Sequence, residues 1–170
     1  MNVLLREARL SDASLLNKLG VETYTHHFEQ YWTHRAELDD FLLQEYSLQV
    51  IESSLADTSA GWYVVETSSP IGFVKVIWRS SMPGTALHGT FLNKLYLSEG
   101  ATGKNYGKYI FNKIAEMAKA KGNDYLWLEV LKENTRARHF YEKQGMTFIR
   151  NNFHKTATQQ VTVDVLGKPL

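Results

Sequence analysis

The chain has 170 residues, a typical length for one domain, and we expect a single domain over residues 1–170. Its 19 Lys and Arg residues nearly balance 18 Asp and Glu residues, and a formal net charge of +1 argues against nucleic-acid binding. The absence of cysteine excludes disulfides and thiolate chemistry. No signal-like apolar stretch and no run of about 18 apolar residues is present, so we expect a cytoplasmic protein with no membrane partner.

The first third of the chain is predicted to be one short strand followed by helices. Residues 3–8 have the pattern of the strand, and Ser11 or Asp12 can cap the helix that follows. A second helix is expected at residues 39–45, and Ser47 can cap a third. The aromatic, histidine-rich segment between the first two helices is left unassigned.

The middle of the chain changes to the period of β-strands. Residues 62–67 and 72–78 are rich in aromatic and β-branched side chains and flank a turn at Ser68-Ser69-Pro70, which predicts an antiparallel hairpin. After a loop that contains Pro83 and Gly84, residues 90–97 are predicted to form the next strand.

The second half alternates helices and strands. An amphipathic helix is predicted at residues 107–121, with Gly122 at its C-terminal end. The apolar residues 125–131 predict a buried strand. The remaining predicted elements are a short helix at 135–143 capped by Asn134, a strand at 146–153 and a strand at 160–166.

This order of elements predicts an α/β fold. We expect a mixed, mostly antiparallel central sheet of about seven strands, flanked by helices. Strand 92–97, helix 107–121 and strand 125–131 form a βαβ unit, so these two strands should be parallel.

The loop before helix 107–121 has the features of a phosphate-binding turn. Gly100, Gly103 and Gly107 lie between a strand and a helix N-terminus, where free backbone N–H groups and the helix dipole favour an anion. Lys104 and Lys108 add positive charge. A flexible turn before an amphipathic helix explains the same residues, and the pattern fits neither a Walker loop nor a dinucleotide fingerprint.

A second motif follows the buried strand. Asn134 is followed by Ala137, by Phe140-Tyr141 and by Gly145-Met146. This segment strongly resembles the second half of the acetyl-CoA-binding core in the GNAT superfamily of N-acetyltransferases. The loop from Thr102 to Gly107 is similar to the family's Gln/Arg-x-x-Gly-x-Gly/Ala signature. The resemblance, with bacterial polyamine-type members among the similar proteins, covers essentially the whole chain.

The resemblance implies an acyl-CoA N-acyltransferase with acetyl-CoA as co-substrate. The two central parallel strands would splay apart, and the pantetheine arm would pair with the backbone of the strand before the loop. The amine would attack the thioester directly, since no cysteine is available to carry an acyl group. The expected cofactor-binding residues are Leu95, Tyr96, Leu97, Thr102, Gly103, Lys104, Asn105, Tyr106, Gly107, Lys108, Asn134 and Lys143.

Three positions depart from the family pattern. Thr102 stands in place of Gln or Arg, and Asn105 stands in place of the first glycine. Asn tolerates a positive φ better than most residues, so the turn can survive this replacement. Asn93 stands where many relatives have a glutamate, and an amide cannot accept a proton from the amine.

The expected catalytic residues are Tyr141 and Glu129. The resemblance makes Tyr141 the general acid that protonates the CoA thiolate, although a packed core tyrosine is the alternative interpretation. Glu129, on the strand next to Asn93, is the leading candidate for the general base and His88 is the second. A solvated strand carboxylate is an equal alternative for Glu129.

The expected partners are CoA and a small-molecule amine, with a homodimer as a further possibility. The amine would lie against the first third, where Tyr24, Tyr31 and Trp32 accompany several acidic residues that attract cations. The acidic residues are Glu22, Glu29, Glu37, Asp39 and Asp40. The six histidines lack the spacing of metal ligands, so no metal is expected.

Two other functions compete with acetylation of a small amine such as a polyamine. One is acetylation of a protein N-terminus or of a lysine. The other is a CoA-binding regulatory module without catalysis, to which the departures at Thr102, Asn105 and Asn93 give some weight.

Overall fold

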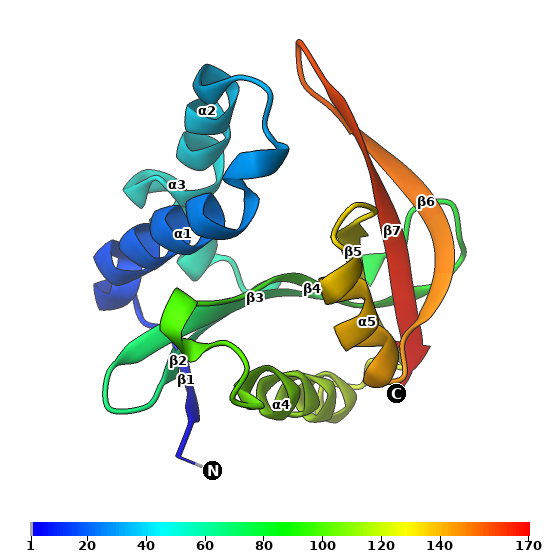
Figure 1. Cartoon of the computed structure of the whole chain (residues 1–170). Helices are drawn as coiled ribbons and strands as arrows, with labels where there is room; N and C mark the ends of the chain where they lie inside the picture. Colours follow the sequence, from blue (N-terminus) through cyan, green and yellow to red (C-terminus); the bar gives the residue numbers. More distant parts are fainter. Residues whose placement is uncertain (1) are drawn as a thin grey trace. The chain divides into compact units, whose positions relative to one another are not determined.

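The computed structural model describes residues 2–170, which contain seven strands and five α-helices (Figure 1). In chain order the elements are β1 (Leu4–Glu7), α1 (Ala13–Phe28), α2 (Arg35–Tyr46), α3 (Leu48–Ala56), β2 (Ala60–Glu66), β3 (Pro70–Ser81), β4 (His88–Leu97), α4 (Tyr106–Ala120), β5 (Tyr125–Leu131), α5 (Thr135–Lys143), β6 (Thr147–Lys155) and β7 (Gln160–Pro169). Short 3₁₀ helices occupy Leu10–Asp12, Glu29–Tyr31 and Glu99–Ala101.

The strands form one sheet in the order β1-β2-β3-β4-β5-β7-β6. The β4–β5 pair is parallel, with Thr90 opposite Leu126 and Phe91 opposite Trp127. The pairs β1–β2, β5–β7 and β6–β7 are antiparallel. The predicted mixed, mostly antiparallel sheet with one parallel pair is therefore confirmed. Helix α4 makes the parallel pairing possible, because parallel neighbours need a long crossover.

The chain divides into two compact units. One comprises the chain up to Val76 together with Lys94–Gly107, and the other comprises Ile77–Asn93 and Lys108–Leu170. Each unit has its own apolar core, and each is described by itself below.

The first unit has a core rich in aromatic residues beneath α1, α2 and α3. Tyr46, at the end of α2, is fully buried, and its ring meets Phe73 at a centroid distance of 5.9 Å. Gly20 lies against this ring, so α1 can approach α2 closely only because Gly20 has no side chain. Trp62 stacks on Phe73 at 6.2 Å and closes the core.

The second unit is built on the buried face of α4 and on β5. Ile110, Phe111, Ile114 and Ala118 of α4 are fully buried, as the amphipathic pattern predicts. Phe91 and Trp127 stack with ring centroids 4.1 Å apart. These contacts join β4 and β5 where the two strands are parallel.

The helix caps show which local predictions hold. Ser47 Oγ accepts from Val50 N at 3.4 Å, and Asn134 Oδ1 accepts from Ala137 N at 3.1 Å, so both predicted caps are confirmed. Asp12 occupies the N-cap position of α1, but its carboxylate makes no cap hydrogen bond. It accepts instead from Arg9 N and from the Arg6 guanidinium. The charged partner competes successfully for the carboxylate oxygens.

Several elements are longer than predicted, among them α2, which begins at Arg35, and β3, which spans Pro70–Ser81. Helix α1 continues into the unassigned segment, residues 25–36, as far as Phe28, where aromatic contacts such as Tyr24–Phe28 at 4.7 Å support it. Strand β7 continues from the predicted end to Pro169, because it pairs with β5 along the whole length of that strand.

Candidate active site

The turn before α4 has the backbone conformation of an anion-binding loop. Gly103 has φ +76° and Asn105 has φ +63°, so two residues of the loop are left-handed. A Cβ on Gly103 would meet no atom within 4 Å, so backbone conformation, not crowding, is what requires glycine there. The expected tolerance of Asn105 for a positive φ is confirmed.

Helix α4 begins at Tyr106, directly after this turn. The N–H groups of its first turn, at Tyr106, Gly107 and Lys108, have no intrahelical acceptor and lie at the positive end of the helix dipole. Thr102 turns its hydroxyl back onto Glu99 O at 3.3 Å, so it does not replace the longer polar side chain of the family pattern. Main-chain donors of this kind fit a diphosphate.

The end of β4 leads into the loop and is held from two sides. Ser98 N donates to Ile71 O at 2.7 Å, which fixes the strand end to β3. His27 of α1 places Nε2 2.8 Å from Leu97 O. Gly72 of β3 lies so close to the Tyr96 carbonyl that a side chain would overlap it. The backbone from Leu95 to Leu97 is therefore well positioned for a strand-like ligand.

Helix α5 carries Tyr141 in the second unit. The Tyr141 ring lies 5.9 Å from the Phe111 ring and 5.1 Å from the Phe140 ring. Burial raises the pKa of Tyr141, so the phenol keeps its proton at neutral pH. No hydrogen bond of its hydroxyl is found among residues 2–170. A protonated phenol of this kind can donate to a ligand.

A buried ion pair anchors α5 to the sheet. Asp164 of β7 is 2% exposed and accepts from Arg138 Nη1 at 2.6 Å and from Asn151 Nδ2 at 2.7 Å. Lys168 Nζ adds a bond to Gln144 O at 3.0 Å, just after the helix. Lys143, in the last turn of α5, is exposed. The orientation of Tyr141 thus depends on contacts that the sequence does not reveal.

Glu129 lies on β5, two residues after Trp127. Its carboxylate accepts from Asn152 Nδ2 at 3.0 Å and from His154 Nε2 at 3.1 Å, both on β6. Burial alone would raise the pKa of Glu129, but the bonds from His154 and Asn152 outweigh this effect and hold it below its usual value. Glu129 is therefore a carboxylate at neutral pH.

The family model of the acetyltransferase (GNAT) family matches residues 20–146 of the chain. The chain belongs to the acetyltransferase (GNAT) family. This assignment makes the protein an acyl-CoA N-acyltransferase. The seven-stranded sheet with its parallel β4–β5 pair agrees with the fold of the family.

Several solved acetyltransferases have the same fold. PaiA N-acetyltransferase from Thermoplasma acidophilum, solved with coenzyme A, superposes with a TM-score of 0.77 at 17% identity and full coverage of both chains. A mutant of spermidine N-acetyltransferase SpeG from Vibrio cholerae matches at 0.69 and 16% identity, over 99% of this chain and 94% of that chain. NAA60 from Arabidopsis thaliana, solved with a bisubstrate analogue, matches at 0.71 and 13% identity, over 98% and 97% of the two chains.

In this GNAT protein the second candidate for the base, His88, is the first residue of β4, and its Nδ1 lies 3.0 Å from Ser81 Oγ.

The aromatic residues expected near the amine form a packed cluster in the first unit. Trp32 Nε1 donates to the Tyr24 hydroxyl at 3.2 Å, and the Tyr24 ring lies 4.7 Å from Phe41. Among the acidic residues, Glu29 and Asp39 are both paired with Arg35. Glu22 and Asp40 are exposed.

One ion pair of this unit could not be expected from sequence. Lys94 of β4 is 4% exposed, and its Nζ lies 2.7 Å from Glu45 Oε1 and 5.0 Å from the centre of the Tyr46 ring. A lysine in a predicted strand does not by itself indicate a buried ion pair, because its partner, Glu45, is 49 residues away in the chain.

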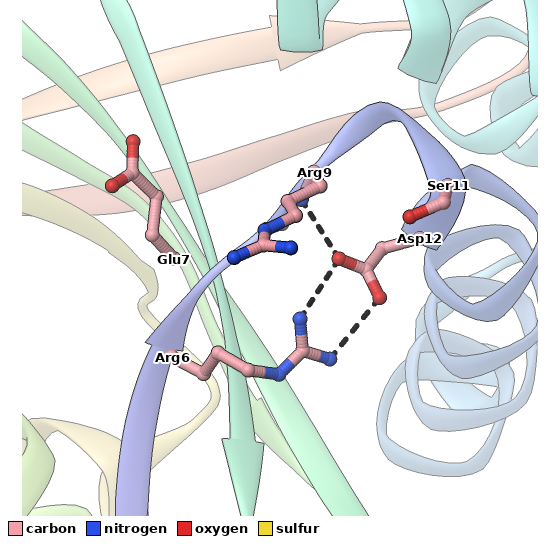
Figure 2. Close-up of a pocket in the computed structure, with 6 residues that line it drawn as sticks. Arg6, Glu7, Arg9, Ser11 and Asp12 are labelled. Carbon is pink, nitrogen blue, oxygen red and sulfur yellow. Dashed lines mark hydrogen bonds and ion pairs between the residues drawn. The ribbon is translucent and has the colours of Figure 1, made fainter.

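An open depression of about 720 Å³ lies where β1 meets α1, lined by residues of the Arg6–Asp12 segment (Figure 2). Arg6 forms a bidentate pair with Asp12 there, while the Glu7 carboxylate points away from that pair. Arg6 also bonds Glu66 of β2 at 3.1 Å. This network fastens α1 to the edge of the sheet, and we assign it a structural role.

Among residues 2–170, no group of three or more His, Cys, Asp or Glu side chains is arranged to hold a metal ion. In the same residues no helix is both long and apolar enough to cross a membrane.

Proposed function

We propose that this GNAT protein transfers the acetyl group of acetyl-CoA to a primary amine of a small molecule, with a polyamine as the representative substrate. The turn before α4 carries the proposal, because two left-handed residues, Gly103 and Asn105, lead into the free N–H groups of the helix. Coenzyme A in the PaiA structure and the name of the Vibrio cholerae relative support the cofactor and the amine class.

The proposed cofactor contacts follow from the local geometry of each segment. The main-chain donors from Gly103 to Lys108 bind the diphosphate, and Lys104 adds charge. The backbone of Leu95, Tyr96 and Leu97 pairs with the pantetheine arm as an added strand would. Asn134 and Lys143, at the two ends of α5, contribute to the cofactor site. Thr102, at the start of the loop, contributes as well.

The proposed reaction needs two proton transfers. The amine must lose a proton before it attacks the thioester carbon, and the CoA thiolate must gain one when the C–S bond breaks. Tyr141 donates the proton to sulfur, for which a neutral, unpaired phenol is suitable. Glu129 takes part in removing the proton of the amine, because Asn93, which stands where many relatives have a glutamate, cannot accept a proton.

Acetyl-CoA consumption with a panel of amines tests the proposal. The panel contains spermidine, propylamine and a peptide with a free N-terminus and one lysine. We expect turnover of spermidine above that of the peptide. A faster peptide reaction would favour a protein acetyltransferase. Calorimetric binding of CoA without turnover of any amine would instead indicate a regulatory module.

Tyr141→Phe tests the acid. Loss of a positioned general acid lowers turnover by about a hundredfold or more, whereas CoA affinity should be preserved. Tyr63→Phe, at a half-buried tyrosine of β2, is the matched control and should keep wild-type kinetics. Equal turnover of Tyr141→Phe and wild type would remove the assignment.

A further inference from the structure

A polar cluster joins β5 to β6 across the strand between them. Glu129 Oε1 lies 3.1 Å from His154 Nε2, and Oε2 accepts from Asn152 Nδ2 at 3.0 Å. Strand β7 separates the two strands, since Glu129 is opposite Val165 and Asn152 is opposite Val163. The Glu129 side chain therefore spans a whole strand to reach two donors that share one face of β6.

The hydrogen bond to Glu129 determines which nitrogen of His154 can accept a proton. A carboxylate can only accept hydrogen bonds, so Nε2 carries the proton when the ring is neutral. The lone pair is then on Nδ1, for which no hydrogen bond is found among residues 2–170. The His154 side chain is 54% exposed, whereas that of Glu129 is 18% exposed. A partly buried carboxylate thus holds a more exposed ring.

We propose that Nδ1 of His154 accepts the proton of the substrate ammonium group, with Glu129 and Asn152 as positioning residues. This inference rests on the proposed amine acetyltransferase function and identifies its base. The ammonium N–H bond breaks and the proton moves to Nδ1. The free amine then attacks the thioester carbon, the C–S bond breaks, and sulfur receives a proton from Tyr141. Tyr141 recovers a proton from the acetylated nitrogen, and His154 releases its proton to water.

Glu129 is unsuited to accept the proton itself. Both of its oxygens already accept hydrogen bonds from β6, and the pKa of Glu129 lies below its usual value. The hydrogen bond to Glu129 acts on His154 in the opposite direction and raises its pKa. The histidine is the stronger base of the pair, as in other carboxylate–imidazole pairs.

Among residues 2–170, Glu129 is the charged group whose hydrogen bond and charge raise the pKa of His154. In register with His154, β7 presents Val161, and its buried Asp164 is engaged by Arg138 and Asn151. On β6 itself the polar residues on the same face are Asn152 and, two positions further along, Arg150, whose guanidinium donates to Pro83 O and Asn151 O. The charge of Glu129 should therefore control the pH at which His154 loses its proton.

The test combines kinetics with a titration of the whole protein. For wild type, His154→Gln and Glu129→Gln, kcat/KM for spermidine is measured from pH 5.5 to 9.5, and CoA affinity is measured by calorimetry. Proton–nitrogen correlation NMR of the histidine rings gives the pKa of His154 without any turnover. His139→Gln, at an exposed histidine of α5, is the control.

We expect His154→Gln to lower kcat/KM by about a hundredfold or more and to abolish the acidic limb of the profile, with CoA affinity unchanged. Glu129→Gln should move that limb to lower pH, by the same amount as the NMR pKa of His154 falls. The control should retain the wild-type profile.

Three results would overturn the inference. One is an acidic limb in His154→Gln with the wild-type midpoint. Another is a His154 pKa in Glu129→Gln equal to that of wild type. In both cases amine acetylation by the wild-type enzyme remains intact, so only the base assignment fails. The third is a wild-type protein that binds CoA and acetylates no amine, which removes the proposed function as well.

Discussion

Gly72→Ala should destabilise the protein at the end of β4. A Cβ at this position would overlap the Tyr96 carbonyl oxygen, and it would lie 2.8 Å from Leu97 Cδ2 and 3.1 Å from Leu97 Cα. A side chain such as Leu97 can change rotamer, but a carbonyl oxygen moves only with its strand. The substitution therefore forces β3 away from the strand end that we propose for pantetheine binding.

The magnitude follows from two opposing terms. Overpacking of a well-packed site costs about 1–3 kcal/mol. Replacement of a strand glycine by alanine recovers about 0.5–1 kcal/mol of backbone entropy. Their difference is a net loss of about 0–2.5 kcal/mol in the free energy of unfolding, with a central value of about 1 kcal/mol. This central value corresponds to a melting temperature lower by about 2–4 °C for a protein of this size.

Gly100→Ala is the matched control for stability. A Cβ on Gly100 would meet no atom within 4 Å, and the φ of Gly100 lies outside the left-handed region, so alanine should be tolerated there. Urea unfolding of both variants and calorimetric titration of Gly72→Ala with CoA measure the effects. Unchanged stability and CoA affinity in Gly72→Ala would refute the steric reasoning.

Three further predictions concern the loop and two ion pairs. Asn105→Gly should raise the melting temperature slightly and Asn105→Ala should lower it, because only glycine adopts φ +63° without strain. Scanning calorimetry of both variants measures the difference, and the reverse order would contradict this reasoning. Glu45→Ala should lower the free energy of unfolding by about 1–3 kcal/mol, since it leaves the buried Lys94 charge unpaired, whereas Lys94→Met should be nearly neutral in the same urea assay. The hydrogen bonds from Arg6 lower the pKa of Asp12, so this pair stabilises the fold above the unfolded-state pKa and the stabilisation is lost as the pH falls through the folded-state pKa. Asp12→Asn should therefore lose less stability than wild type between pH 5 and pH 2.5, and parallel curves would exclude this role for Asp12.

Local chemistry made much of the fold predictable. Ser47 and Asn134 cap their helices through their own side chains, so the cap is encoded within three residues. The predicted bounds of β5 and α5 coincide with the observed ones, because a continuous apolar run and a capped helix leave few alternatives. The tolerance of Asn105 for a left-handed conformation was also evident from its residue type.

Contacts between distant segments were not predictable. Asp12 could cap α1 by residue type, and only the fold brings Arg6 and Glu66 together beside it. The partners of Glu129 lie on β6, and their identity depends on the register of β7 between them. In a single sequence, Asn152 and His154 are two polar residues of an exposed strand.

The order of strands leaves β1 and β6 with an unpaired side, where another strand could add. Both edges resist such growth. β1 is four residues long, and it carries Arg6 and Glu7. β6 has an irregular register between Phe148 and Arg150, and a break of this kind bends a strand away from a flat partner. Fibre-like stacking of copies through these edges is therefore disfavoured, even though β6 exposes two phenylalanine rings.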